Sequence, residues 1–225
     1  MRTIRWLITL LILSGILAGV SSAQNPPAAP RGAAPGGRAG GLRGGRGGRG
    51  GGGGVQVMTL VTTAWPDGGI IPLRYTQAGP EVSPAIQWSG APQGTACFVL
   101  IFHDADSLVN NSTDGILHWL LWNIPGTAAG IPQGRPDGFE WEDGTRQISV
   151  SGSRYRGPGA PASGPIHHYV MELYALDTML DVKVDPQGPQ DPNPNVQAIR
   201  ASIFQAMVGH IRGKAAYVGL FHRPQ

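Results

Sequence analysis

The sequence predicts a mainly β protein, an antiparallel β-sandwich with a few peripheral helices, one of them near the C-terminus. Three observations lead to this fold class. From residue 55 onward the apolar runs are short and rich in β-forming residues, Pro and Gly turn signals separate them, and one segment alone has a convincing helical period. The sequence has no internal repeat at the periods typical of solenoid proteins.

The predicted strands are apolar runs of four to nine residues, a length that suits a strand better than a helix. Turn signals lie between them, for example Pro66–Gly69, Ala78–Pro80 and Pro136–Gly138, where Pro fixes φ and Gly accepts a positive φ. The predicted strands are Val55–Thr63, Ala85–Trp88, Ala96–Phe102, His118–Asn123, His168–Ala175 and Ala215–His222.

The predicted helix spans Val196–Ile211. Apolar residues recur there at spacings of three and four, which gives the helix one apolar face. Asn195 is placed to cap its N-terminus, and Gly213 follows as a stop signal. The apolar face is formed by Val196, Ile199, Ile203, Met207 and Ile211.

The first 23 residues have the features of a signal peptide. Arg2 and Arg5 precede an apolar run, and small residues end it before Gln24. The run is shorter than the roughly 20 residues that a membrane span needs. We therefore expect cleavage, an exported product in the periplasm or outside the cell, and no transmembrane segment. Val20 stands where a lipoprotein carries its acylated cysteine, so we expect no lipid anchor.

Residues 24–54 hold Gly, Pro, Ala and five arginines, with no acidic residue. Almost nothing there can bury apolar area, so we expect a disordered tether. Alternatives are contact with anionic lipid or cell-wall polymer, or an interaction module in which the tether binds and the fold is a platform. Residues 55–225, the predicted folded domain, contain ten Lys and Arg against fourteen Asp and Glu. We therefore expect no nucleic-acid partner for the folded domain.

Polar side chains gather at three places beside the predicted strands. His103–Asp106 follows the strand that ends at Phe102, His118 opens the next strand, and Tyr155–Tyr169 holds a Gly/Pro loop and two histidines. Strand ends and adjoining loops are where a rigid scaffold brings functional groups together. We expect the functional residues of the chain in these three stretches.

The carboxylates and histidines of these stretches are compatible with more than one kind of site. For Asp104 and Asp106 we expect one carboxylate to face a pocket and the other to meet solvent, so that they do not form an acid/base pair. His118 and His167 are able to hydrogen-bond to an anion or, when protonated, to attract it. With Asp104 they could also ligate zinc or iron, although no His-x-x-x-His or similar spacing indicates a metal.

The sequence gives little support to nucleophilic catalysis. It contains no Gly-x-Ser-x-Gly motif and no Gly-x-x-x-x-Gly-Lys phosphate loop. Its single cysteine, Cys97, lies in an apolar run and is predicted to be a buried structural thiol. The alternative is a metal-assisted or Ser hydrolase in the Asp/His cleft, because the members of a triad need not be close in sequence. We expect a binding protein with no catalytic residue, metal or cofactor.

Taken in order, five motifs resemble those of the phosphatidylethanolamine-binding protein family, in particular its bacterial Raf-kinase-inhibitor-like branch. The similar stretch covers about residues 65–223. The motifs are Ser83–Pro92 with Gly94-Thr95 for the Ser-Pro…Trp…Pro…Gly-Thr lead-in, Asp104–Asp106 for Asp-Pro-Asp-Ala-Pro, His118-Trp119…Asn123–Gly126 for His-Trp…Asn-Ile-Pro, Tyr155–Pro158 with Pro161 for Tyr-x-Gly-Pro-x-Pro-Pro, and His167–Tyr169 for His-Arg-Tyr.

The resemblance implies a β-sandwich with a small pocket near a surface end of its sheets. The expected ligand is a small anionic group: phosphate, a phospholipid headgroup or a phosphorylated metabolite. Inhibition of an enzyme, and hence a protein target, is a further role that the resemblance implies. Imidazole donors, loop amides and the tyrosine hydroxyl would surround the phosphate oxygens. The residues carried over to this pocket are Asp104, His118, Gly157, His167 and Tyr169.

Overall fold

The computed structural model describes residues 54–108, 113–186, 188 and 195–225. The predicted signal peptide, residues 1–23, and nearly all of the predicted tether, residues 24–54, lie outside the described residues. Within the described ranges, no helix combines the length and the apolar character that a membrane crossing requires.

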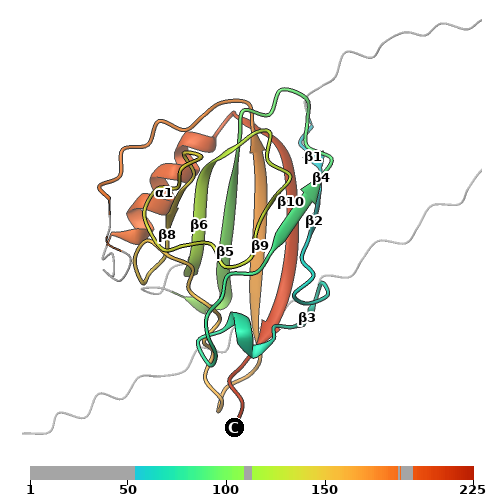
Figure 1. The fold of residues 1–225 in the computed structure, drawn as a ribbon, viewed down its shortest axis with the longest axis vertical. Helices are drawn as coiled ribbons and strands as arrows, with labels where there is room; N and C mark the ends of the chain where they lie inside the picture. Colours follow the sequence, from blue (N-terminus) through green and yellow to red (C-terminus); the bar gives the residue numbers. More distant parts are fainter. Residues whose placement is uncertain (1–53, 109–112, 187, 189–194) are drawn as a thin grey trace, which may run out of the picture. The chain divides into compact units, whose positions relative to one another are not determined.

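Two sheets form the core of the described region, and the prediction of a mainly β sandwich is confirmed (Figure 1). The large sheet has the strand order β1-β10-β9-β5-β6-β8, with β3 also paired to β10, and the small sheet has the order β2-β4-β7. The strands are β1 Gln56–Val57, β2 Thr59–Val61, β3 Gly69–Ile70, β4 Ile86–Ser89, β5 Cys97–Leu108, β6 Gly115–Pro125, β7 Gly130–Ile131, β8 Arg146–Ile148, β9 His167–Leu176 and β10 Ile211–Phe221.

The main strands of both sheets pair antiparallel, as predicted. The exceptions among the described residues are β1 and β3, which are two residues long and pair in parallel with β10. The predicted strand Val55–Thr63 is divided into β1 and β2, which belong to different sheets. This segment therefore crosses from the edge of the large sheet to the small sheet.

The central strand β5 is apolar on both faces because each face meets a separate layer. Phe98, Leu100 and Phe102 belong to the cluster between the two sheets. Cys97, Val99 and Ile101 belong to the cluster between the large sheet and the helix α1 (Figure 1). A strand buried on both faces reads as a continuous apolar run, which is the pattern of Cys97–Phe102.

The helix α1, Val196–Met207, confirms the predicted helix near the C-terminus but ends four residues earlier than expected. The backbone leaves the helical conformation at Val208, whose ψ is 126°, Gly209 follows with a φ of +84°, and β10 begins at Ile211. The backbone oxygen of Asn195 accepts the first helical hydrogen bond, while its side chain makes no capping bond. The other helical element in the described residues is a 3-10 turn, Leu73–Tyr75.

Candidate functional site

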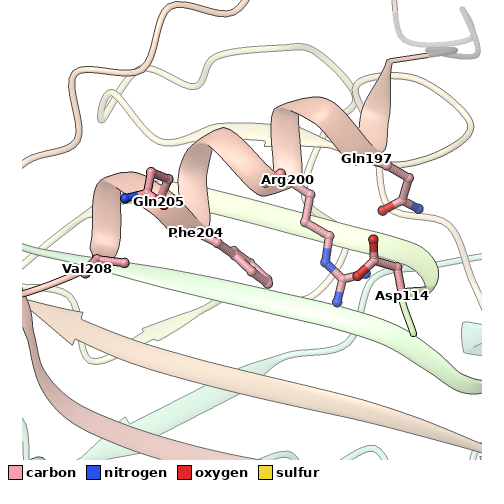
Figure 2. A pocket seen from close by; sticks show the side chains of 7 residues that line it. Asp114, Gln197, Arg200, Phe204, Gln205 and Val208 are labelled. Atoms are coloured by element: carbon pink, nitrogen blue, oxygen red, sulfur yellow. The ribbon is translucent and has the colours of Figure 1, made fainter. Parts of the chain in front are cut away.

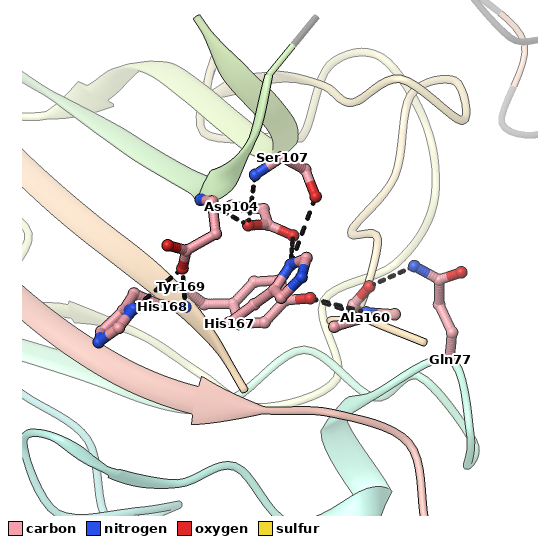
Figure 3. A network of polar contacts seen from close by, with 10 residues as sticks. Gln77, Asp104, Ser107, Ala160, His167, His168 and Tyr169 are labelled. Atoms are coloured by element: carbon pink, nitrogen blue, oxygen red, sulfur yellow. Dashed lines mark hydrogen bonds and ion pairs between the residues drawn. The ribbon is translucent and has the colours of Figure 1, made fainter. Parts of the chain in front are cut away.

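Asp104 lies within β5, two residues after Phe102, on the face that turns toward the small sheet, and its side chain is 4% exposed. Its Oδ1 accepts hydrogen bonds from the amides of Asp106 at 2.9 Å and Ser107 at 3.1 Å. Its Oδ2 lies 2.8 Å from Nδ1 of His167 (Figure 3). The carboxylate is thus held in place by its own chain on one side and by an imidazole on the other.

Asp106 turns toward solvent, although residues two apart on a regular strand share a face. The pairing of β5 with β6 is irregular between Asp104 and Leu108, which allows the two side chains to diverge. Its Oδ2 accepts from the backbone amide of His168 at 2.6 Å and lies 2.9 Å from Nδ1 of the same residue (Figure 3). Both side chains are well exposed, Asp106 at 41% and His168 at 55%. His167 therefore pairs with Asp104, and the neighbouring His168 pairs with Asp106.

His118 reaches the site through a β-bulge. Leu120 and Trp122 belong to the cluster under α1, so strict alternation would place His118 on that face as well. The register instead pairs Phe102 with Trp119 and His103 with Leu117, which leaves His118 as the extra residue. Bulges re-aim side chains next to functional sites. Its ring consequently packs against Phe102 at 5.8 Å and Tyr169 at 5.1 Å between ring centroids.

The environment of His118 keeps its imidazole neutral. The ring is buried, and burial is the main reason why its pKa falls from 6.5 to about 4, although the nearby Asp104 acts in the opposite direction. Nδ1 lies 3.0 Å from the backbone oxygen of Arg156. A neutral ring that donates from Nδ1 carries its lone pair on Nε2. His118 therefore offers a hydrogen-bond acceptor at Nε2.

Tyr169 fastens the Gly/Pro loop to the sheet. Its hydroxyl oxygen accepts hydrogen bonds from the amides of Gly159 at 3.2 Å and Ala160 at 3.0 Å (Figure 3). Burial raises the pKa of the hydroxyl, and Asp104 raises it further. The hydroxyl is thus engaged with the loop and with Asp104.

Gly157 is required by a close approach of two backbone segments. A Cβ at this position would lie 2.6 Å from the backbone oxygen of Tyr75, nearer than real Cβ contacts allow. Its amide donates to Oε1 of Glu81 at 3.1 Å, and its oxygen accepts from Nε2 of Gln77 at 2.7 Å. Its amide is therefore used within the fold.

A cavity of about 220 Å³ lies at this end of the sheets. Three predicted site residues line it: Asp104, His118 and Tyr169. The other two, His167 and Gly157, are not among its lining residues, but each contacts one that is. His167 contacts Asp104, and the oxygen of Gly157 accepts a hydrogen bond from Gln77. Sequence reasoning missed the rest of the lining, which consists of Gln77, Ser107, Ile116, Arg156, Gly159, Ala160 and Pro161.

Arg156 is the most consequential of the missed residues because it brings a positive charge to the cavity. Its Nη1 contacts Oγ of Ser151, and its Nη2 lies 3.2 Å from Oε1 of Gln77. Nε is buried and has no hydrogen-bond partner in the described part of the chain. Burial lowers the pKa of the guanidinium, which nevertheless stays charged. The position of Arg156 within the Tyr155–Pro158 motif was a signal from which its role in the cavity could have been predicted. Gln77 lies far away in sequence and carried no such signal.

The arrangement around His167 differs from a catalytic triad. Oγ of Ser107 lies 3.3 Å from Nδ1 of His167, the same nitrogen that faces Asp104. In a triad the serine and the aspartate bind opposite ring nitrogens, so that the ring can pass a proton between them. As for a metal, the described residues contain no group of three or more His, Cys, Asp or Glu side chains arranged to hold one.

Comparison with known proteins gives the same family for sequence and for fold. The sequence model of the family "Phosphatidylethanolamine-binding protein" matches residues 61–222. A UPF0098 protein of Methanothermobacter thermautotrophicus is 38% identical over 168 residues, 74% of this chain and 99% of that protein. A second relative, from Mycobacterium tuberculosis, is named as a candidate lipoprotein, LppC, and is 30% identical over 69% of this chain and 73% of its own length.

Two solved structures share the fold. The phosphatidylethanolamine-binding protein homologue of Chlamydia trachomatis superimposes with a TM-score of 0.59 at 24% identity, over 75% of this chain and 99% of that one. Escherichia coli YbcL, described as a member of the mammalian family, gives 0.55 at 20% identity, over 74% and 98%. The match of the family model to residues 61–222, together with the relative that is 38% identical, shows that the chain belongs to the phosphatidylethanolamine-binding protein family.

Proposed function

We propose that this family member is an exported, non-enzymatic binding protein that takes a small anionic group which also carries a proton to donate. The observation that supports this proposal is the lining of the 220 Å³ cavity, where the Arg156 guanidinium and the neutral His118 imidazole stand with the Asp104 carboxylate. A volume of this size suits a headgroup or a phosphorylated metabolite, and not a whole lipid.

The charges of the lining explain why the ligand needs both properties. Arg156 has a buried Nε–H without a partner among the described residues, and it favours an anionic oxygen. His118 has its Nδ1 occupied by a backbone oxygen, so the group it can bind is a donor. A phosphate monoester, whose second pKa is about 6, still carries one hydroxyl proton in part of the population near neutral pH. Phosphoethanolamine also has an ammonium group, which could donate to His118 or Asp104.

The proposal that the protein is exported rests on its N-terminal sequence and on the name of one relative. Residues 1–23 have the pattern of a cleaved signal, and the Mycobacterium tuberculosis relative carries a lipoprotein name. This chain has Val20 in place of the acylated cysteine, so we propose release into the periplasm or the medium instead of a lipid anchor. A protein target, through which the chain would inhibit an enzyme, stays a prediction.

Calorimetric titration of the purified full chain with phosphoethanolamine tests the proposal. We expect binding that Arg156→Gln weakens about 10- to 100-fold, because a hydrogen bond to a charged group contributes about 1.5–3 kcal/mol. The matched control is Arg146→Gln, since Arg146 pairs with Glu140 at the surface and does not line the cavity. Inorganic phosphate and ethanolamine, titrated separately, distinguish the two parts of the headgroup. Equal affinity of Arg156→Gln and the unaltered protein would contradict the proposed anion site.

A further inference from the structure

A second cavity, of about 290 Å³, lies between α1 and the start of β6 (Figure 2). It is on the α1 side of the large sheet, whereas Asp104 faces the small-sheet side. Gln197, Arg200 and Phe204 from α1 form one wall, and Asp114 stands opposite them. This cavity shares no lining residue with the proposed anion site.

Polar atoms in this cavity are buried without protein partners. Arg200 is 6% exposed, and its Nη1 donates to the backbone oxygen of Gly115 at 3.0 Å. Its Nε is buried and has no hydrogen-bond partner within the described residues. The same holds for both amide atoms of Gln197, Nε2 and Oε1, whose side chain points toward the same space (Figure 2). Buried polar groups are nearly always hydrogen-bonded, so such atoms lining a cavity indicate that something else binds them.

The charges around the cavity disfavour an anion. The carboxylates of Asp114 and Glu172 both act on Arg200 and favour its charged form, against the effect of burial. The guanidinium therefore already has two acidic neighbours, and a further negative charge would stand close to Asp114. A neutral hydrogen-bonding group avoids this repulsion.

The unpartnered atoms define the complementary group. Arg200 Nε–H and the Gln197 NH₂ are donors and require an acceptor, whereas Gln197 Oε1 requires a donor. A carboxamide supplies both, through its C=O and its N–H. A carboxylate lacks the donor.

An apolar hollow adjoins this cavity and could receive the rest of the ligand. It has a volume of about 180 Å³ and is lined by Tyr174, Phe204, Met207 and Ile211. Phe204 belongs to the lining of both spaces. Small-molecule sites commonly combine such an apolar surface with a few convergent polar groups.

We propose that the space between α1 and β6 is a second binding site, which takes a neutral amide with a short apolar chain. The amide binds Gln197 and Arg200, and the chain lies along Phe204 toward Met207 and Ile211.

Nuclear magnetic resonance titration of the isotope-labelled full chain with hexanamide tests this site. We expect shifts of the Gln197 side-chain amide and of the Arg200 Nε–H resonance. Hexanoate and hexanol, which have the same chain length, should bind about tenfold or more weakly, because a site built for hydrogen bonds rejects analogues that leave them unmade. Gln197→Met keeps the side-chain size and removes the amide, so it should weaken hexanamide binding to a similar degree.

Gln197→Met has a second expected effect that does not depend on the ligand. Removal of the unpartnered buried atoms should raise the melting temperature of the free protein. Gln87→Met is the control, since Gln87 is exposed on β4 and does not line this cavity, and it should alter neither property. If hexanol bound as tightly as hexanamide, the site would be an apolar hollow that does not recognise an amide, and the proposal would fail. Tight hexanamide binding by Gln197→Met, or the absence of shifts at Gln197 and Arg200, would also overturn the proposal.

Discussion

Acidification is expected to destabilise the protein through His118. Its pKa is about 4 in the folded protein and 6.5 when unperturbed. Between these two values the unfolded chain binds a proton at this residue and the folded chain does not, so the free energy of unfolding falls as the pH decreases. The effect is absent above pH 6.5 and complete below pH 4.

The size of the effect follows from the two pKa values. Their difference corresponds to about 3 kcal/mol over the whole range, and linkage gives about 2 kcal/mol between pH 7 and pH 5. This is a large fraction of the about 5–15 kcal/mol by which a typical domain is stable. His103 adds to the trend, because burial also lowers its pKa.

Urea unfolding at several pH values between 7 and 5 measures the effect, and His118→Asn isolates it. An asparagine amide is able to donate to the Arg156 oxygen in place of Nδ1, but it does not titrate. The unaltered protein should therefore lose about 2 kcal/mol more than His118→Asn over this range. If His118→Asn shows the same loss as the unaltered protein, His118 is not a neutral buried histidine and the reasoning fails.

Three further outcomes can be measured with the same preparation. Gly157→Ala should lower the free energy of unfolding by about 1–3 kcal/mol, because its Cβ would overlap the Tyr75 oxygen, while Gly164→Ala, whose nearest neighbour is 3.4 Å away, should change it little in urea unfolding. Tyr169→Phe removes the acceptor of two loop amides and should cost about 1–3 kcal/mol. It should also speed hydrogen exchange at these amides, and unchanged exchange would contradict their bonding to the hydroxyl. Cys97, with its pKa raised to about 11 mainly by burial, should react with a thiol reagent only after unfolding, so rapid labelling of the native protein would disprove its burial.

The sequence by itself determined the fold class and most of the strands. Short β-rich runs, turn signals at Pro and Gly, and a single helical period were enough, because these are local properties of the chain. The motifs from Ser83 to Tyr169 also led to the right family and to Asp104, His118 and Tyr169 as residues of the cavity. The different orientation of Asp104 and Asp106 did not follow from the two-residue period of a strand, which puts such residues on one face; it depends on the irregular pairing of β5 with β6 after Asp104.

The helix shows where local reasoning reached its limit. Its apolar period continues to Ile211, but the chain turns out of the helix at Val208 and Gly209, and Ile211 packs from β10 instead. Arg200 lies buried on the side that an apolar pattern assigns to hydrophobic residues. The spacing of residues within one helix or strand does not determine which groups of other elements a side chain contacts.

Only the tertiary structure decided the chemistry of the cavity. The bulge that turns His118 away from the α1 face depends on pairing between β5 and β6, and its neutral charge depends on burial. Gln77 and Arg156 meet across a long stretch of sequence, so no local pattern could join them. Register, burial and long-range proximity arise from packing of the whole chain, and they set which atoms of the predicted residues remain available to a ligand.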